Sequence, residues 1–358
     1  MTFKEAVRSR RGEKRGSKKS QRLKARLFRR YKEKESRYKR LRRFQRENRA
    51  TAKVLEAIAA DLERGSVRWQ KYADRVRGCG RYVLVKTCQC CQYMGSFHGS
   101  RECGFKLCMF YQQKASSKKR RKIEKLVGVM KKPRFATFTV KHGREDSLQA
   151  TLGKLNKGWQ KLLRRKEWKH HVDGGVSSLE VTWHQDNGWH PHLHVVFDGV
   201  YFPQKKLRAL WHEVTGDSYV VDVRAVDEGV ISEMSKYLSK PSSLLYEFER
   251  HGKQYFMKTD DQGEPVPLPF ETQKGITKEF IETMHRRRTL KVFGNLKGKL
   301  KELEELEELE EPEEEQCPNC QIDIFLQVVM PIDRALDLYK AQEQLELEIR
   351  GPPGGKAA

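Results

Sequence analysis

Three histidines alternate with other residues in the segment His190-Pro-His192-Leu-His194. Successive side chains of a β-strand point to opposite faces, so the three imidazoles would share one face, about 7 Å apart for each step of two residues. Two such imidazoles can converge on one divalent ion, and a carboxylate would complete a site suited to Mg²⁺ or Mn²⁺. The segment therefore predicts a metal site on one face of a sheet.

A candidate carboxylate lies on the preceding strand. Residues 186–188 (Asp-Asn-Gly) have turn chemistry and separate two segments of strand-like residues, which predicts a β-hairpin. With that turn, Glu180 would lie opposite His194 and Thr182 opposite His192. A shift of one residue in the register would move Glu180 to the other face. We expect Glu180 to be the third metal ligand.

A second group of reactive side chains follows about forty residues later. Glu233, Tyr237 and Lys240 are spaced by four and three residues, so they share one face of a helix. A tyrosine phenolate can attack a phosphodiester and become linked to the 5′ phosphate. Lys240 can offset the developing negative charge, and Glu233 can accept a proton from water for hydrolytic release. The apolar stripe that would hold this helix to a core consists of Val230, Ile231, Met234 and Leu238.

The elements that must position these groups alternate between helices and strands. Hydrophobic periodicity predicts strands over residues 134–140, 177–183, 190–197 and 219–223, and helices over residues 148–165, 204–214 and 230–239. This order favours an α+β domain with a central antiparallel sheet flanked by helices.

The charge of the chain points to a polyanionic partner. The 358 residues carry a formal net charge of +25, and neutralising phosphates with Lys and Arg releases counterions. Residues 1–50 alone hold 22 Lys and Arg against 5 Glu, whereas residues 301–316 hold 10 Glu. A merely solubilising charge is the alternative. We expect four regions: a basic helical arm (1–70), a Cys-rich segment (71–126) that is irregular over residues 78–114, a catalytic domain (127–300) and an acidic linker with a C-terminal tail (301–358).

The eight cysteines indicate metal binding rather than disulfides. The sequence has no apolar run long enough to span a membrane and no secretory signal, so we expect a reducing, cytoplasmic location and no membrane partner. A structural zinc site formed by Cys88, Cys91, Cys103 and Cys108 is chemically reasonable. Three further residues could substitute as ligands, namely Cys79, Cys90 and His98. The pair Cys317 and Cys320 could complete a separate site or bind nothing, and free thiols in a loop are the alternative for the whole set.

The motifs together resemble those of rolling-circle plasmid replication initiators of the HUH endonuclease superfamily, in the class with one catalytic tyrosine and a nearby glutamate. Residues 135–140 (FATFTV) are similar to the first motif of that family. Residues 189–194 (WHPHLH) match the metal-binding motif, with His192 and His194 as the ligand pair, and residues 237–240 (YLSK) match the third. Glu233 falls where this class places its hydrolytic glutamate. The resemblance covers about residues 134–297.

The resemblance implies the HUH endonuclease fold and a bound Mg or Mn ion. It implies site-specific nicking of single-stranded or cruciform origin DNA by transesterification, giving a 5′-phosphotyrosine link and a free 3′-OH primer, with glutamate-assisted hydrolysis at termination. A host replication helicase and polymerase would be partners. Members often carry a cysteine cluster closed by a CPxC pair before the first motif, but here Tyr111 stands where the second cysteine of that pair would be.

Two other classes of protein remain as alternatives. The histidine segment also has the pattern of a histidine-triad nucleotide hydrolase or transferase, in which a histidine attacks the phosphate and no tyrosine or metal is needed. A non-enzymatic, zinc-containing nucleic-acid-binding protein is the second alternative. Relaxases and HUH transposases share the predicted chemistry and are closer relatives of the main hypothesis.

Overall fold

The computed structural model describes residues 36–62, 65–79, 81–99, 103–235, 242–251, 254–308, 317, 320 and 325–350. The chain divides into two compact units, residues 44–335 and residues 1–43 with 336–358. In the smaller unit, the backbone amide of Tyr38 donates to the Glu343 carboxylate over 3.1 Å. Residues 1–35 of the predicted basic arm lie outside the described residues. All features below belong to the larger unit unless stated otherwise.

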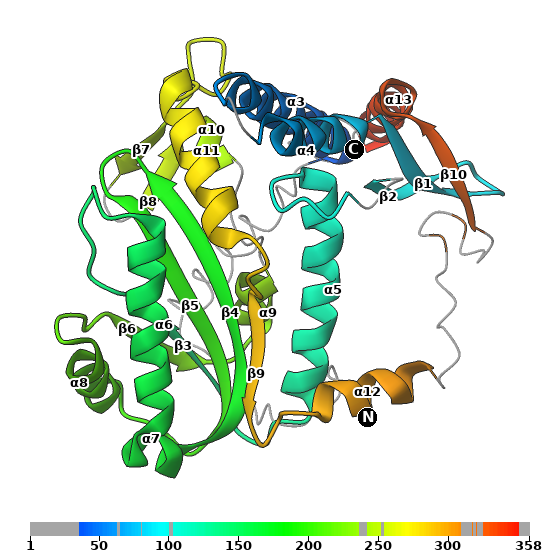
Figure 1. Ribbon diagram of the computed structural model, residues 1–358. Helices are drawn as coiled ribbons and strands as arrows, with labels where there is room; N and C mark the ends of the chain where they lie inside the picture. The colour runs from blue at the N-terminus through cyan, green and yellow to red at the C-terminus, as the bar shows by residue number, and fades with distance from the viewer. Residues whose placement is uncertain are drawn as a thin grey trace. The chain divides into compact units, whose positions relative to one another are not determined.

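A five-stranded antiparallel sheet is the largest sheet of the described chain (Figure 1). Its strands lie in the order β6 (Val221–Ala225), β3 (Pro133–Phe138), β5 (Gly188–Gly199), β4 (Val172–His184) and β9 (Leu290–Gly294). The alternating and apolar segments of the sequence predicted four of these strands, and all neighbouring pairs are antiparallel. The predicted α+β class with an antiparallel sheet is confirmed.

The hairpin of β4 and β5 has a different register from the one predicted. Glu180 pairs with His192 rather than His194, and Thr182 pairs with His190. The turn is centred on Asp186, because Gly188 belongs to β5. Gly188 has φ +70°, and a Cβ there would lie 2.3 Å from a backbone oxygen of Arg144. The shift is an even number of residues, so Glu180 stays on the predicted face.

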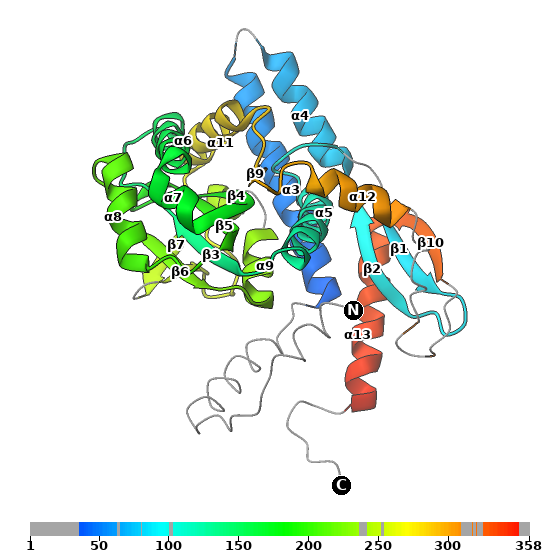
Figure 2. The same ribbon diagram turned by 90° about the horizontal axis from the view of Figure 1, so that it is seen from below.

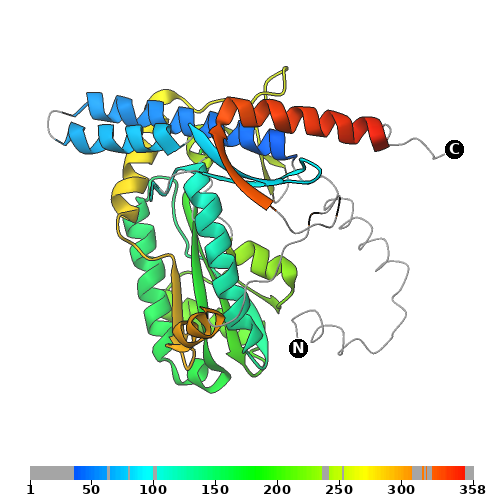
Figure 3. The same ribbon diagram turned by 90° about the vertical axis from the view of Figure 1, so that its right-hand side faces the viewer.

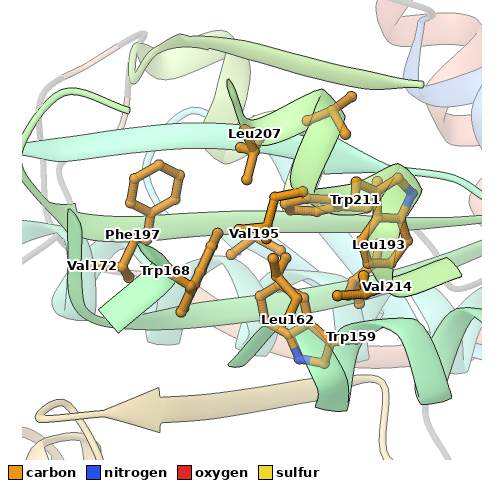
Figure 4. Close-up of a cluster of buried hydrophobic side chains, with 14 of the residues drawn as sticks. Trp159, Leu162, Trp168, Val172, Leu193, Val195, Phe197, Leu207, Trp211 and Val214 are labelled. Carbon is orange, nitrogen blue, oxygen red and sulfur yellow. The ribbon is translucent and has the colours of Figure 1, made fainter. Parts of the chain in front are cut away.

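One face of the sheet is closed by α6 (Leu148–Arg164), α7 (Lys166–His171) and α8 (Gln204–Thr215). The helices bury an aromatic cluster against β5. Figure 4 shows Trp159, Trp168 and Trp211 around Val195 of this strand. The helical spacing of the apolar residues predicted α6 and α8 closely.

The opposite face is covered by α5 (Met109–Gly128) and α9 (Glu228–Ser235). Figure 2 shows these two helices on one side of the sheet and α6, α7 and α8 on the other. Their apolar side chains, including Ile123 and Ile231, pack on Phe135 and Val196. Residues 236–239 of the predicted helix lie outside the described residues.

The cysteine-rich segment, predicted to be irregular, contains two strands. β1 (Tyr82–Cys88) pairs with β2 (Met94–Gly99) on one side and with β10 (Phe325–Pro331) on the other, and all pairs are antiparallel. In Figure 3, β10 is the orange-red strand beside the cyan hairpin. The prediction of an irregular segment was wrong because β1 obtains part of its pairing from a strand that is distant in sequence.

The other described elements are α3 (Arg37–Ala60), α4 (Ser66–Cys79), α10 (Ser242–Leu245), β7 (Phe248–His251), β8 (Gln254–Met257), α11 (Phe270–Met284), α12 (Lys299–Glu308) and α13 (Ile332–Arg350). Helices α3 and α13 each contain residues of both compact units. The described beginning of the acidic linker is helical and belongs to α12. Among the described helices, none has the length and apolar character needed to cross a membrane.

Candidate active site and cysteine clusters

His194 lies at the centre of a polar cluster on the sheet face covered by α5 and α9. Its side chain is almost fully buried, and its Nε2 is 3.0 Å from Oε2 of Glu180 on the neighbouring strand. Its Nδ1 shares a hydrogen bond of 3.1 Å with the hydroxyl of Thr137 on β3. Three adjacent strands therefore orient this imidazole, and Glu180 reaches it diagonally although it pairs with His192.

Glu233 on α9 approaches the same imidazole. Its Oε1 is 3.6 Å from His194 Nδ1, and its other oxygen accepts from the Arg224 guanidinium. Arg224 lies 4.7 Å above the ring of Phe135, which in turn stacks on His194 at 5.8 Å. The structure thus brings Glu180, His194 and Glu233 together from three elements. Arg224 fixes the Glu233 carboxylate, and no sequence spacing indicated this role.

Tyr237 and Lys240 lie outside the described residues, so their positions are not assigned. The last described turn of α9 is anchored on the histidine face by two hydrogen bonds. The Ser178 hydroxyl on β4 donates to the Met234 carbonyl over 2.9 Å, and the Ser116 hydroxyl on α5 donates to the Ser235 carbonyl. These contacts fix the chain up to two residues before Tyr237.

Two of the histidines of β5, His190 and His192, have lowered pKa values, which favours their neutral form at physiological pH. Burial, followed by repulsion from neighbouring imidazoles, lowers the pKa of His190 to about 3. Burial also lowers the pKa of His192 to about 4, and the nearby Glu180 carboxylate opposes this shift. Neutral imidazoles are the form that binds metal ions.

The donor chemistry of His192, His194 and Glu180 fits a divalent cation, because it combines two imidazole groups with one carboxylate. The rings of His192 and His194 lie parallel with centroids 5.8 Å apart. Among the described residues, only cysteine groups bring three or more ligand atoms within 4.8 Å of one another. To complete a metal site, the side chain of His192 would therefore have to rotate toward His194 and Glu180.

A cleft of about 700 Å³ opens beside these histidines. Its lining includes His190, whose Nδ1 is 2.6 Å from Nε2 of His142, together with the cationic side chains of Lys141 and Arg144. Tyr255 also lines the cleft and stacks on the His184 ring at 4.0 Å. A cleft with cations and stacking rings next to the histidines suits a nucleic-acid strand.

A groove rich in lysine and arginine lies along α5. Its volume is about 520 Å³, and its lining contains seven cationic residues and no acidic residue. The cations are Lys106, Lys114, Lys118, Lys119, Lys122, Arg287 and Arg288. Burial lowers the pKa of Lys119 to about 8, while the charge of Glu180 acts in the opposite direction. Lys119 therefore lies within electrostatic range of the histidine site. The sequence showed only a basic run, which on a helix is most often a solvated face.

The four predicted zinc ligands do not come together. Cys88 and Cys91 form one group with Cys317 and Cys320, whereas Cys103 and Cys108 form another with Cys79. Cys88 and Cys91 lie at the β1–β2 turn, while Cys108 precedes α5 and Cys79 ends α4. The predicted set therefore mixed residues from two separate places in the fold.

The group of Cys79, Cys103 and Cys108 is fully buried. Hydrogen bonds from the Cys103 and Cys79 thiols hold the pKa of Cys108 well below its usual value. The Asn48 amide also lies 3.3 Å from the Cys108 sulfur. Both groups offer soft sulfur ligands of the kind that binds zinc.

Comparisons with known proteins assign the chain to a family. The sequence model of the family described as "Replication protein" matches residues 95–328. "Protein rep" of Streptococcus pneumoniae serotype 2 is 29% identical over 220 residues, which cover 54% of this chain and 67% of the relative. "Protein rep" of Staphylococcus aureus is 29% identical over 126 residues, covering 31% and 55%. "Protein rep" of a Bacillus species is 30% identical over 102 residues, covering 26% and 33%. No solved structure matches the chain.

The family model matches more than half of the chain, so the protein belongs to the replication-protein family. This confirms the resemblance to plasmid Rep initiators, and a family of replication initiators implies DNA as a partner. The matched regions span between one third and two thirds of the three relatives.

Proposed function

We propose that this protein is an HUH-type endonuclease that initiates rolling-circle plasmid replication by nicking origin DNA with Tyr237. The observation that carries the proposal is the cluster of Glu180, His194 and Glu233 on one face of an antiparallel sheet. Family membership supports it independently, because a replication initiator needs a means of producing a primer end.

The proposed reaction is a transesterification. The Tyr237 phenol oxygen attacks the scissile phosphorus, its proton passes to a base or to solvent, and the bond from phosphorus to the 3′ oxygen breaks. The products are a 5′-phosphotyrosine link and a free 3′ hydroxyl that primes synthesis. Lys240 offsets the charge on the phosphate oxygens, and we assign Lys119 a supporting electrostatic role.

Hydrolytic release at termination is assigned to Glu233. Its carboxylate lies beside His194 and is held by Arg224, so it can accept a proton from a water that attacks the phosphotyrosine. Arg224 acts through Glu233 and is therefore a positioning residue.

His192, His194 and Glu180 are the residues that would hold Mg²⁺ or Mn²⁺. Such an ion would supply Lewis-acid polarisation of the scissile phosphate. The neutral state of His192 and the orientation of His194 by Thr137 and Glu180 prepare the ligands for that role. A structural zinc ion in the cysteine groups would be a separate cofactor.

The histidine-triad alternative requires an imidazole that is accessible to the nucleotide, and the burial of His194 disfavours it. A nucleophilic imidazole must reach the phosphate in line, but the side chain of His194 is 4% exposed and contacts Glu180. His192 remains the only imidazole of the predicted metal pair that lines the cleft. A non-enzymatic nucleic-acid-binding protein would not need a carboxylate on each side of a buried histidine.

A covalent adduct assay tests the proposal. The full-length protein is incubated with single-stranded origin-like DNA and Mn²⁺, and the protein–DNA adduct is measured on a denaturing gel. We expect Tyr237→Phe to abolish the adduct and Glu233→Ala to retain nicking but slow hydrolytic release. Tyr255→Phe is the matched control, because Tyr255 lines the cleft and we assign it no covalent step.

Three outcomes would contradict the assignments. An adduct that survives Tyr237→Phe would remove Tyr237 as the nucleophile. Unchanged release in Glu233→Ala would remove that carboxylate from the mechanism. Hydrolysis of small nucleotides without metal would instead support the histidine-triad chemistry.

Under our proposal, His190→Ala should still form the adduct.

A further inference from the structure

Four cysteine sulfurs from two distant parts of the chain meet at one end of the three-stranded sheet. The Cys88 and Cys320 sulfurs are 3.5 Å apart, and the Cys91 and Cys317 sulfurs are 3.6 Å apart. All four sulfurs lie within 4.8 Å of one another. We propose that Cys88, Cys91, Cys317 and Cys320 bind one zinc ion, and that this ion joins β10 to the β1–β2 hairpin.

The sulfur spacing matches tetrahedral zinc coordination. A Zn–S bond of about 2.3 Å places neighbouring sulfurs about 3.8 Å apart in a tetrahedron. The observed separations of 3.5 and 3.6 Å are close to that value and much longer than a disulfide bond. None of the four cysteines forms a disulfide, and each has a sulfur neighbour at ligand spacing.

The backbone at Cys88–Cys91 has the geometry of a metal-binding turn. The Gln92 amide donates to the Cys88 carbonyl, and Gln92 has a positive φ of 59°, which folds the chain back into β2. The backbone amide of Cys88 donates to the Tyr93 carbonyl over 2.9 Å, so both backbone polar groups of Cys88 are held within the turn.

The strand register explains why the second pair reaches the first. Cys88 at the end of β1 pairs with Phe325 at the start of β10. Cys317 and Cys320 precede β10 by only a few residues, so they reach the same end of the sheet as the β1–β2 turn. The result is a zinc-ribbon arrangement whose two cysteine pairs are 226 residues apart along the chain, with the five-stranded sheet between them.

The small sheet has little apolar burial with which to hold β10 by itself. Val83, Val85 and Phe97 of the hairpin are fully buried, whereas β10 buries Met330 but leaves Leu326, Val328 and Val329 exposed. A three-stranded sheet is marginal without further packing, and pairing segments that are far apart costs loop-closure entropy. A metal that links both segments would offset that cost.

Metal analysis of matched variants tests the site. The full-length protein and the double variant Cys317→Ser/Cys320→Ser are purified with zinc, dialysed, and analysed for bound metal by mass spectrometry. We expect the double variant to hold one zinc equivalent fewer than the wild type, whether or not the Cys79 group also binds zinc. Cys90→Ser is the control, because Cys90 is an exposed neighbour outside the four-sulfur group.

Two further measurements separate metal loss from misfolding. Cys320→His should keep the zinc equivalent, because imidazole can replace a thiolate ligand. Amide hydrogen exchange of Phe325–Pro331 should rise at least about tenfold in the double variant, while exchange in β5 stays unchanged.

Several results would overturn the proposal. These are an unchanged zinc content in the double variant, an equal loss in Cys90→Ser, or wild-type protein that holds no zinc in either cysteine group. Iron with visible absorption in place of zinc would contradict the metal assignment. The proposal stands on the sulfur geometry and does not depend on the nicking activity.

Discussion

The two faces of the five-stranded sheet differ in composition although they share the same strands. On the face below α6, α7 and α8, residues Leu193, Val195 and Phe197 of β5 join an aromatic core. On the face below α5 and α9, Phe135 and Val196 pack among apolar residues, but His194 of β5 meets the carboxylates of Glu180 and Glu233. Successive side chains of β5 point to opposite faces of the sheet. We call the face below α6, α7 and α8 the supporting face, and the face that carries His192 and His194 the reactive face.

The difference shows how a buried polar site is kept in place. Buried polar groups cost free energy unless they are paired, so the carboxylates and imidazoles of the reactive face are held by hydrogen bonds. The tightly packed opposite face gives the strands one fixed position. Changes on the two faces should therefore separate activity from stability, and the predictions below test that separation.

The largest effect is expected from His194→Ala. Removal of the imidazole takes away a proposed metal ligand, so adduct formation with Mn²⁺ should fall more than about 100-fold, because even changes that only touch a ligand cost about 10- to 100-fold. The control is His170→Ala, an exposed histidine of α7 on the other side of the sheet. If both variants retained the wild-type rate, the reactive face would not be the active site.

A large effect on stability is expected from Trp211→Ala. Trp211 is fully buried, and its indole donates to the Thr139 carbonyl over 2.8 Å. Truncation should lower the free energy of unfolding by about 3–5 kcal/mol, measured by urea denaturation. Adduct formation per folded molecule should change little.

The exposed neighbour His212 provides the matched control on the same helix. His212→Ala should change the free energy of unfolding by about 0.5 kcal/mol or less. A Trp211→Ala protein that is stable but inactive would show that the supporting face takes part in the reaction directly.

The smallest effect is a pH dependence from Lys119. Burial lowers the pKa of this ammonium to about 8, so its positive charge is present at pH 7 and is lost as the pH rises through that value. Affinity for single-stranded DNA should fall a few-fold between pH 7 and pH 9. Lys119→Arg should flatten this dependence, because a guanidinium stays charged over the whole range.

Lys118→Arg serves as the control for that measurement, because Lys118 lines the same groove but is exposed. Its pH profile should follow the wild type. A wild-type affinity that does not change between pH 7 and pH 9 would remove Lys119 from the DNA-binding surface.

Local periodicity predicted the parts of the fold whose partners are close in sequence. The β4–β5 hairpin, α6 and α8 were expected within a few residues, because each carries its own apolar pattern. The pair of Glu180 and His194 was found from the strand alternation, although the hairpin register differed by two residues. Glu180 was placed on the correct face of the sheet, because a register shift of two residues leaves each side chain on the same face.

Partners that are distant in sequence left no local signal. The ion pair of Arg224 with Glu233 depends on how β6 lies beside α9, and spacing alone did not indicate it. The joining of Cys88 and Cys91 with Cys317 and Cys320 depends on the pairing of β1 with β10. The CxxC spacing suggested metal binding, but the choice of pairs required the sheet topology.

The separation of the two cysteine pairs has a consequence during synthesis. Cys91 leaves the ribosome 226 residues before Cys317, which corresponds to about 10–45 s at roughly 5–20 residues per second. The five-stranded sheet is synthesised within that interval and can fold before the second pair emerges. A chain that terminates early would lack two of the four thiols, so the completed cysteine group would mark a polypeptide translated at least as far as Cys320.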